Sequence, residues 1–181
     1  MIFSKKKNSI LIEKIYQNII QRSRLKFFYL DKQIEDTFES RFDLIIFHSF
    51  IIFQFFRENK IKDESSLSQN LFDFMFKDFE NNLREMGFGD VAVNKKMKVF
   101  ISAFYGRISS YSKGIKLFRE ENDRTILYDA ICNNIYKNKN VNSAHIDFFI
   151  EYLLLNISNF RENSLEDNIK NKFSFISYNN I

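Results

Sequence analysis

The sequence predicts an all-α fold, a single-domain bundle of about six helices. Its length of 181 residues suits one domain. Four glycines and no prolines are too few for an all-β chain, which needs turn residues about every 8 to 12 positions. Apolar residues instead recur three and four positions apart, the spacing of helices with one buried face. We expect the helical domain to cover residues 1–163. The order of the tail, residues 164–181, stays open because it begins with a polar stretch.

Apolar spacing and capping sequences define the first three predicted helices. Isoleucines at helical spacing mark the first over residues 9–23, after a basic tail. The sequence Asp-Thr-Phe-Glu at 36–39 has the form of a capping box, so the second helix is expected over 37–58. Another capping box, Ser-Leu-Ser-Gln at 66–69, is expected to open the third helix. The inward side chains of the third helix are expected to be Leu67, Leu71, Phe74, Phe79, Leu83 and Met86.

Gly87 is expected to end the third helix. A glycine can take the left-handed conformation after Met86 without a steric penalty. Phe88 would then pack against Leu83 in a Schellman arrangement, which satisfies the last carbonyl groups of the helix.

Three more helices are predicted after this turn, over residues 94–118, 122–136 and 143–160. The first of these, the fourth overall, has a broad apolar face and a ridge of small residues four positions apart. The ridge predicts a close helix crossing within the domain, in preference to a contact between molecules. Its members are Ser102, Gly106, Ser110 and Gly114. The inward side chains of the sixth helix are expected to be Ile146, Phe149, Ile150, Leu153, Leu154 and Ile157.

The most apolar run of the chain, residues 42–56, predicts a buried core helix. Its 15 residues would rise about 22 Å as a helix, short of a hydrocarbon core of roughly 30 Å. Asp43, His48 and Gln54 also interrupt the run. A helix that dips into a membrane is the alternative.

The fourth predicted helix is one-sided in charge. No Asp or Glu occurs from residue 91 to residue 119. Such a segment attracts anionic partners, which include lipid headgroups, RNA and an acidic protein face. The alternative is an ordinary solvated face. The basic residues of this segment are Lys95, Lys96, Lys98, Arg107, Lys113, Lys116 and Arg119.

Cysteine and histidine, which often act in catalysis or metal binding, are scarce in this sequence. One cysteine and two histidines cannot form an internal disulfide or a zinc site of the usual spacing. His48 and His145 are expected to be core or capping residues, and Cys132 a buried inert thiol. The glycines at 87 and 89 follow a helix and lack the full fingerprint of a phosphate loop. We therefore predict no catalytic residue, no metal and no cofactor, and expect the chain to act by binding a macromolecule.

Three segments carry a resemblance to a known family. They are LREMGFGD at 83–90, AFYGR at 103–107 and, upstream, DTFESRFDLIIFH at 36–48. With these motifs the chain resembles the ubiquinol-cytochrome c chaperone family over most of residues 10–160. It departs from the family pattern at Ser40, Phe88 and Asn94.

The resemblance implies a helical assembly factor of the cytochrome bc complex that binds newly made cytochrome b. Mitochondrial members of the family work with a small partner protein and the mitochondrial ribosome, which are therefore further candidate partners. No targeting extension precedes the match, which favours a bacterial member. The resemblance also implies residues for contacts with a client or partner: Arg84, Glu85, Asp90, Lys95, Lys96, Tyr105, Gly106 and Arg107. The alternative is that Arg84 pairs with Glu80, Asp90 caps the next helix, and Tyr105 and Arg107 brace the turn.

The leading hypothesis is a non-enzymatic assembly chaperone without a small-molecule substrate. It would bind cytochrome b or its assembly intermediates during biogenesis of ubiquinol-cytochrome c reductase. It would lie in the cytoplasm, peripheral at the inner membrane, with the basic helix toward anionic lipid or the client. The alternative is a membrane-surface or RNA-binding helical adaptor with a different client, and an enzyme comes third.

Overall fold

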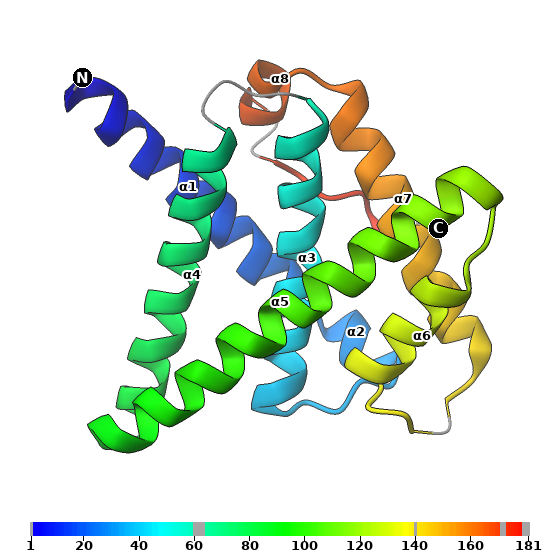
Figure 1. Ribbon diagram of the computed structural model, residues 1–181, viewed down its shortest axis with the longest axis horizontal. Helices are drawn as coiled ribbons and strands as arrows, with labels where there is room; N and C mark the ends of the chain where they lie inside the picture. The colour runs from blue at the N-terminus through cyan, green and yellow to red at the C-terminus, as the bar shows by residue number, and fades with distance from the viewer. Residues whose placement is uncertain (1, 60–63, 140, 171–172, 179–181) are drawn as a thin grey trace.

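The computed structural model describes residues 2–59, 64–139, 141–170 and 173–178 (Figure 1). These residues form eight helices and no β-strand, and six of the helices have ten residues or more. The prediction of an all-α bundle of about six helices is confirmed. The helices are α1 (Ile2–Ser23), α2 (Lys26–Leu30), α3 (Phe38–Glu58), α4 (Glu64–Glu85), α5 (Asp90–Glu121), α6 (Thr125–Asn134), α7 (Ser143–Glu162) and α8 (Leu165–Lys170).

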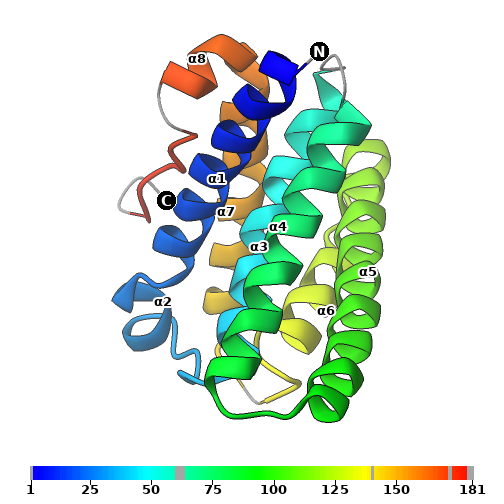
Figure 2. The same cartoon turned by 90° about the vertical axis from the view of Figure 1, so that its left-hand side faces the viewer.

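Helix α3 lies at the centre of the bundle. It packs against α1, α4, α5 and α7, and Figure 2 shows it enclosed between α4 and α7. Its residues 42–52 and 54–56 are all buried, so the prediction of a buried core helix over this run is confirmed. Among the described residues, none of the helices has the length and apolar character that crossing a bilayer requires.

The observed helix starts differ from several predicted ones. Helix α3 begins one residue later than predicted, because Thr37 is its N-cap: Thr37 Oγ1 accepts a hydrogen bond from the Ser40 amide at 3.2 Å. The carboxylate of Asp36 is held by Arg41, at 2.6 Å, and is not free to cap. Helix α4 already begins at Glu64, so the predicted capping box at 66–69 is wrong. An acidic residue in the first turn stabilises that earlier start through the helix dipole.

Two other starts are also earlier than predicted. The backbone of residues 2–8 belongs to α1, where a basic tail was expected. Helix α5 begins at Asp90 and not near residue 94. A tight turn at Gly87 leads directly into α5, with Gly89 as N-cap and the Asp90 carboxylate in the first turn.

Two predicted inward residues of α4 point outward. Phe74 is 37% exposed and Met86 is 58% exposed, whereas Met75 and Phe76 are buried. The buried face of α4 is wide because the helix packs against α1, α3 and α5. Met86 follows the last residue of α4 and so lies outside that face. In α7 the predicted inward residues are buried, except that Leu154 is only half-buried.

Part of the polar tail packs against the core. Phe173 is 2% and Phe175 is 6% exposed. The Arg22 guanidinium donates a hydrogen bond to the Phe175 carbonyl oxygen at 2.5 Å, and the Ile176 amide donates to Asn156 Oδ1 at 2.9 Å. These contacts fix residues 173–178 beside α1 and α7 (Figure 2).

The ridge of small residues on α5 makes one close crossing. Gly114 is buried against α6, where an added Cβ would lie 2.6 Å from Leu127 Cδ2 and 3.1 Å from the Leu127 amide nitrogen. Gly106 is exposed, and no atom lies within 4 Å of its Cβ position. The predicted close crossing within the domain is therefore confirmed at Gly114, and Gly106 takes no part in it.

These two glycines give a matched pair of variants. We expect Gly114→Ala to lower the free energy of unfolding by about 1 to 3 kcal/mol, because the new methyl group overlaps Leu127 and its backbone. Gly106→Ala is expected to raise it by about 0.5 to 1 kcal/mol, because the position is open and alanine is the better helix former. Urea denaturation of both variants measures the difference. Equal stability of the two would contradict the close crossing.

Candidate functional site

The turn between α4 and α5 has the predicted Schellman geometry. Gly87 has φ of 86°, in the left-handed region. The Phe88 amide donates to the Leu83 carbonyl oxygen at 3.2 Å, and the Gly87 amide donates to the Arg84 carbonyl oxygen at 2.9 Å. This pair of bonds satisfies carbonyl groups that the end of α4 leaves open. The prediction for Gly87 is confirmed.

Arg84 joins the two sides of this turn. Its guanidinium pairs with Glu80 on α4 at 2.7 Å and also with Asp90 at the start of α5. The carboxylates of Asp90 and Glu80 together raise the pKa of Arg84. The expected pairing of Arg84 with Glu80 is confirmed, whereas Asp90 binds Arg84 and makes no side-chain capping bond. All three side chains are exposed at 40% or more, so each pair contributes little stability.

Arg107 points into the protein. Its Nε lies 2.5 Å from Oδ1 of Asp43 on α3, and the Asp43 side chain is only 1% exposed. The contact is an ion pair without the alignment of a hydrogen bond. Lys137, in the segment between α6 and α7, pairs with the other Asp43 oxygen. Burial lowers the pKa of Arg107 and that of Lys137. We call Asp43, Arg107 and Lys137 the Asp43 cluster.

The Asp43 cluster ties three parts of the chain together. Asp43 belongs to the 36–48 motif and Arg107 to the 103–107 motif, so this ion pair joins two of the segments that carry the family resemblance. Arg107 does not reach the α4–α5 turn and does not brace it. The arrangement gives Arg107 the role of holding α5 against α3.

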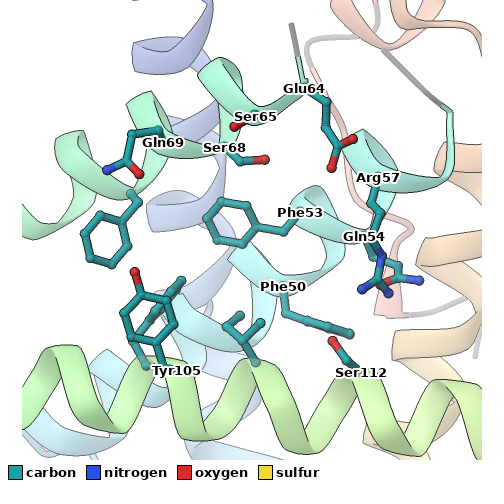
Figure 3. A pocket seen from close by; sticks show the side chains of 13 residues that line it. Phe50, Phe53, Gln54, Arg57, Glu64, Ser65, Ser68, Gln69, Tyr105 and Ser112 are labelled. Carbon is teal, nitrogen blue, oxygen red and sulfur yellow. The ribbon is translucent and has the colours of Figure 1, made fainter. Parts of the chain in front are cut away.

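A groove with aromatic walls lies between α3, α4 and α5 (Figure 3). Its volume is about 410 Å³. Tyr105, which is 58% exposed, stacks on Phe72 of α4 with ring centroids 5.8 Å apart. Figure 3 shows Tyr105 reaching from α5 toward α4, with Phe53 of α3 on the other side. The remaining apolar lining is Phe50, Phe104 and Ile108. We call this feature the aromatic groove.

Polar side chains rim the aromatic groove. Arg57 and Glu64 lie at one end of it, as Figure 3 shows. Arg57 donates a hydrogen bond to Gln54 Oε1 at 2.5 Å. Serines and glutamines occupy much of the remaining rim: Gln54, Ser65, Ser68, Gln69 and Ser112. An apolar floor with a polar rim suits the binding of a protein segment that offers apolar side chains.

The histidines and the cysteine lie apart from this groove. His48 is fully buried: its Nδ1 lies 2.7 Å from the Leu44 carbonyl oxygen and its Nε2 lies 3.2 Å from the Tyr152 hydroxyl. His145 is half-buried in the first turn of α7, and Cys132 is half-buried, not fully buried as predicted. In the part of the chain that the structure describes, no three His, Cys, Asp or Glu side chains converge as a metal site would require.

The eight predicted contact residues fall in four places. Arg84, Glu85, Asp90, Lys95 and Lys96 lie around the α4–α5 turn or in the first turns of α5. Lys95 is exposed, and the Lys96 ammonium lies 4.8 Å from the centre of the Phe88 ring. The structure places the remaining three elsewhere on α5: Tyr105 in the aromatic groove, Gly106 on the outward face and Arg107 in the Asp43 cluster.

The structure defines the chain as an all-α helical domain with an open aromatic groove. A family model described as Ubiquinol-cytochrome C chaperone matches residues 31–175. The chain belongs to the ubiquinol-cytochrome c chaperone family, as its motifs predict.

The chain is also similar to curated proteins. The chain is 23% identical over 151 residues to human "Ubiquinol-cytochrome c reductase complex assembly factor 1", a match that covers 83% of this chain and 48% of the relative. It is 26% identical over 155 residues to "Protein CBP3, mitochondrial" of Saccharomyces cerevisiae, covering 83% and 44%. The chain therefore spans about half the length of these relatives.

A solved structure has the same fold. The crystal structure of the Cbp3 homolog from Brucella abortus matches with a TM-score of 0.79 and 27% sequence identity, over 99% of this chain and 97% of that one. The similarity thus includes α1 and α2, which lie outside the residues matched by the family model.

Sequence reasoning missed most of the aromatic groove. Phe72, Phe53 and Gln69 were not among the candidates, because 23 phenylalanines make a single aromatic uninformative. The Asp43 cluster had one usable signal, an acidic residue inside the most apolar run of the chain. A buried carboxylate requires a cationic partner, so the sequence could have predicted an inward cation, although not which one.

Proposed function

We propose that the chain is a non-enzymatic assembly chaperone that binds cytochrome b during biogenesis of ubiquinol-cytochrome c reductase. Family membership supports the general role, and the human relative is named as an assembly factor of that complex. The client would be cytochrome b or an assembly intermediate that contains it. The chaperone would act at the cytoplasmic face of the inner membrane as a peripheral protein.

The aromatic groove is the observation that carries this proposal. An unassembled subunit of a membrane complex exposes apolar side chains that its final partners will cover. A groove of about 410 Å³, lined by Phe53, Phe72 and the half-exposed Tyr105, can cover several of them. Aromatic anchors in such a groove supply most of the binding energy of a protein interface. The polar rim keeps the groove hydrated while it is empty.

The predicted contact residues have different roles in this proposal. Tyr105 contacts the client, and Gly106 leaves the α5 surface beside it free of a side chain. Glu85, Lys95 and Lys96 are proposed to contact the client or a second protein, such as the small partner protein or the ribosome. Arg84 and Asp90 hold the turn that presents them. Arg107 acts through the Asp43 cluster, by fixing the α5 wall of the groove.

Site-specific photocrosslinking tests the client site. A photoreactive amino acid at Gln69, exposed on the rim, is expected to crosslink to newly made cytochrome b. The same residue at Lys14, exposed on α1 and outside the groove, is the control and should give no such product. Equal crosslinking at both positions, or none at Gln69, would contradict the assignment of the groove.

Tyr105→Ala is expected to weaken client binding about tenfold, which corresponds to loss of one aromatic anchor of about 1.4 kcal/mol. The variant should fold normally because Tyr105 is 58% exposed. Leu30→Ala on α2 is the matched control, since Leu30 is 72% exposed and lies outside the groove. Recovery of cytochrome b from detergent-solubilised membranes measures binding. In a strain lacking the gene, quinol:cytochrome c electron transfer should return with the Leu30 variant and remain low with the Tyr105 variant.

A further inference from the structure

One line of exposed residues runs along the outward side of α5. Apart from the adjacent pair Tyr105 and Gly106, successive members are three or four positions apart, so they share one helix face. The helix has 32 residues and is about 48 Å long. Figures 1 and 2 show α5 along the outside of the bundle, with α3 and α4 on its inner side. We call this line the α5 stripe: Val91, Lys95, Lys98, Ser102, Tyr105, Gly106, Ser109, Lys113 and Lys116, all of them exposed.

The charge of the α5 stripe is left unneutralised. Among the residues that the structure describes, Lys95, Lys98 and Lys113 make no ion pair, and Lys116 has only Glu120, at 3.9 Å. The two arginines of the same helix are paired internally. Arg107 is paired with Asp43 and Arg119 with Glu58. Among the described residues, the unpaired basic charge of α5 is therefore all lysine: Lys95, Lys98 and Lys113 lie on the stripe, and Lys96 lies off it beside the Phe88 ring. Glu121, at the end of the helix, adds one unpaired negative charge.

Apolar side chains stand among these lysines. Val91 is 86% exposed, and Val99, which lies beside the stripe, is 60% exposed. Met86 at the preceding turn is 58% exposed. Aliphatic side chains beside lysines are the composition of a surface that lies in the headgroup region of a membrane, where the charges meet anionic lipid and the apolar groups enter its outer edge.

The composition favours lipid over RNA. Single-stranded RNA is bound by stacking on open aromatic rings in a basic groove. Tyr105 is the only aromatic residue of the α5 stripe, and one face of its ring is stacked on Phe72. Arginine, which forms paired hydrogen bonds to phosphate, is absent from the stripe. Lysines are point charges that suit a fluid array of headgroups without fixed positions.

We propose that the α5 stripe docks the protein on an anionic lipid surface. The helix axis would lie along the membrane plane, with Lys95 and Lys98 near one end and Lys113 and Lys116 near the other. The small residues Ser102, Gly106 and Ser109 between them let the helix backbone approach the headgroups closely. This inference names the residues that would hold the protein at the membrane, and it rests on the peripheral location proposed above. It does not require that the client be cytochrome b.

Vesicle binding of the purified full chain tests the proposal. The chain is expected to sediment with vesicles that contain phosphatidylglycerol and not with pure phosphatidylcholine vesicles, and binding should weaken as salt is raised. Each lysine near such a surface contributes about fivefold, so Lys95→Gln/Lys98→Gln and Lys113→Gln/Lys116→Gln should each lower binding roughly 25-fold. Val91→Ser/Val99→Ser should also lower it, without altering the salt dependence.

The matched control is Lys14→Gln/Lys77→Gln, which makes the same change of charge at exposed positions of α1 and α4. It should change vesicle binding less than about threefold, because these lysines lie off the stripe. Three results would overturn the proposal: an equal loss in the control, no preference for phosphatidylglycerol, or stripe variants that lose RNA binding while vesicle binding is intact. Crosslinking in detergent is independent of these vesicle measurements, so the client assignment and the lipid assignment can fail separately.

Discussion

Asp43→Ala is expected to lower the free energy of unfolding by about 3 to 5 kcal/mol, the largest loss from a single substitution that we predict. The Asp43 carboxylate is 1% exposed and faces two cations, Arg107 from α5 and Lys137 from the α6–α7 segment. Its removal leaves the Arg107 guanidinium, only 16% exposed, without a counter-charge. An uncompensated charge at a buried site costs far more than the net value of the pair that it replaces. Urea denaturation, followed by the loss of helical circular dichroism, measures the effect.

Two further variants test whether the unpaired buried charge, and not the mere loss of a side chain, causes this destabilisation. Asp36→Ala removes a carboxylate that is 53% exposed and paired with Arg41, so its cost should be much smaller than that of Asp43→Ala. Asp43→Leu/Arg107→Met removes both buried charges and should recover much of the loss, because apolar residues can replace a buried ion pair. If Asp43→Ala costs no more than Asp36→Ala, the Asp43 cluster does not anchor α5.

His48 is expected to make the fold sensitive to acid. Burial, the largest cause, lowers the pKa of His48 from its ordinary value of 6.5 to about 3, and the charge of Arg22 adds to the effect. The Leu44 carbonyl oxygen, 2.7 Å away, acts in the other direction. Below pH 6.5 the unfolded chain takes up a proton on His48 that the folded chain does not. Stability therefore falls as pH falls, by about 1.4 kcal/mol per pH unit until the folded-state pKa is reached.

The resulting loss from His48 amounts to about 2 to 3 kcal/mol between pH 6.5 and pH 4.5. Carboxylates titrate in the same range, so the comparison needed is between the wild-type chain and His48→Gln. The difference in their free energies of unfolding should shrink by that amount as pH is lowered. A difference that stays constant from pH 6.5 to pH 4.5 would show that His48 is not held neutral. The neutral imidazole should also persist to pH 4.5 in an NMR titration.

Local features of the fold could be predicted well from the sequence. The Gly87 turn followed from one glycine at the end of an apolar stripe, because only glycine takes its left-handed conformation freely. The burial of α3 followed from the apolar run at 42–56. Helix starts were less accurate, since Asp36 and Thr37 can each cap a helix and the choice depends on Arg41, which holds the Asp36 carboxylate.

The sites depend on contacts between distant segments and were harder to predict. Nothing in the sequence near Arg107 indicates that its partner lies on α3, so Arg107 was expected to contact a client or partner, or else to brace the turn. The aromatic groove needs three helices at once. Tyr105 could be named from its motif, but its neighbour Phe72 becomes identifiable only when α4 is placed against α5. The lysines of the α5 stripe were recognised as a basic segment, and the structure adds which of them face outward.

The central position of α3 also limits how the aromatic groove can change within this family. Phe50 and Phe53 form the α3 wall of the groove, on a helix that four others enclose, and Phe50 is itself a core residue with 1% exposure. A new side chain there would disturb the interior as well as the groove. The α4 and α5 walls, at Gln69 and Tyr105, face solvent and can vary without that penalty. Variation of the groove is therefore freer along the two outer helices, while the inner helix is constrained by the packing of the core.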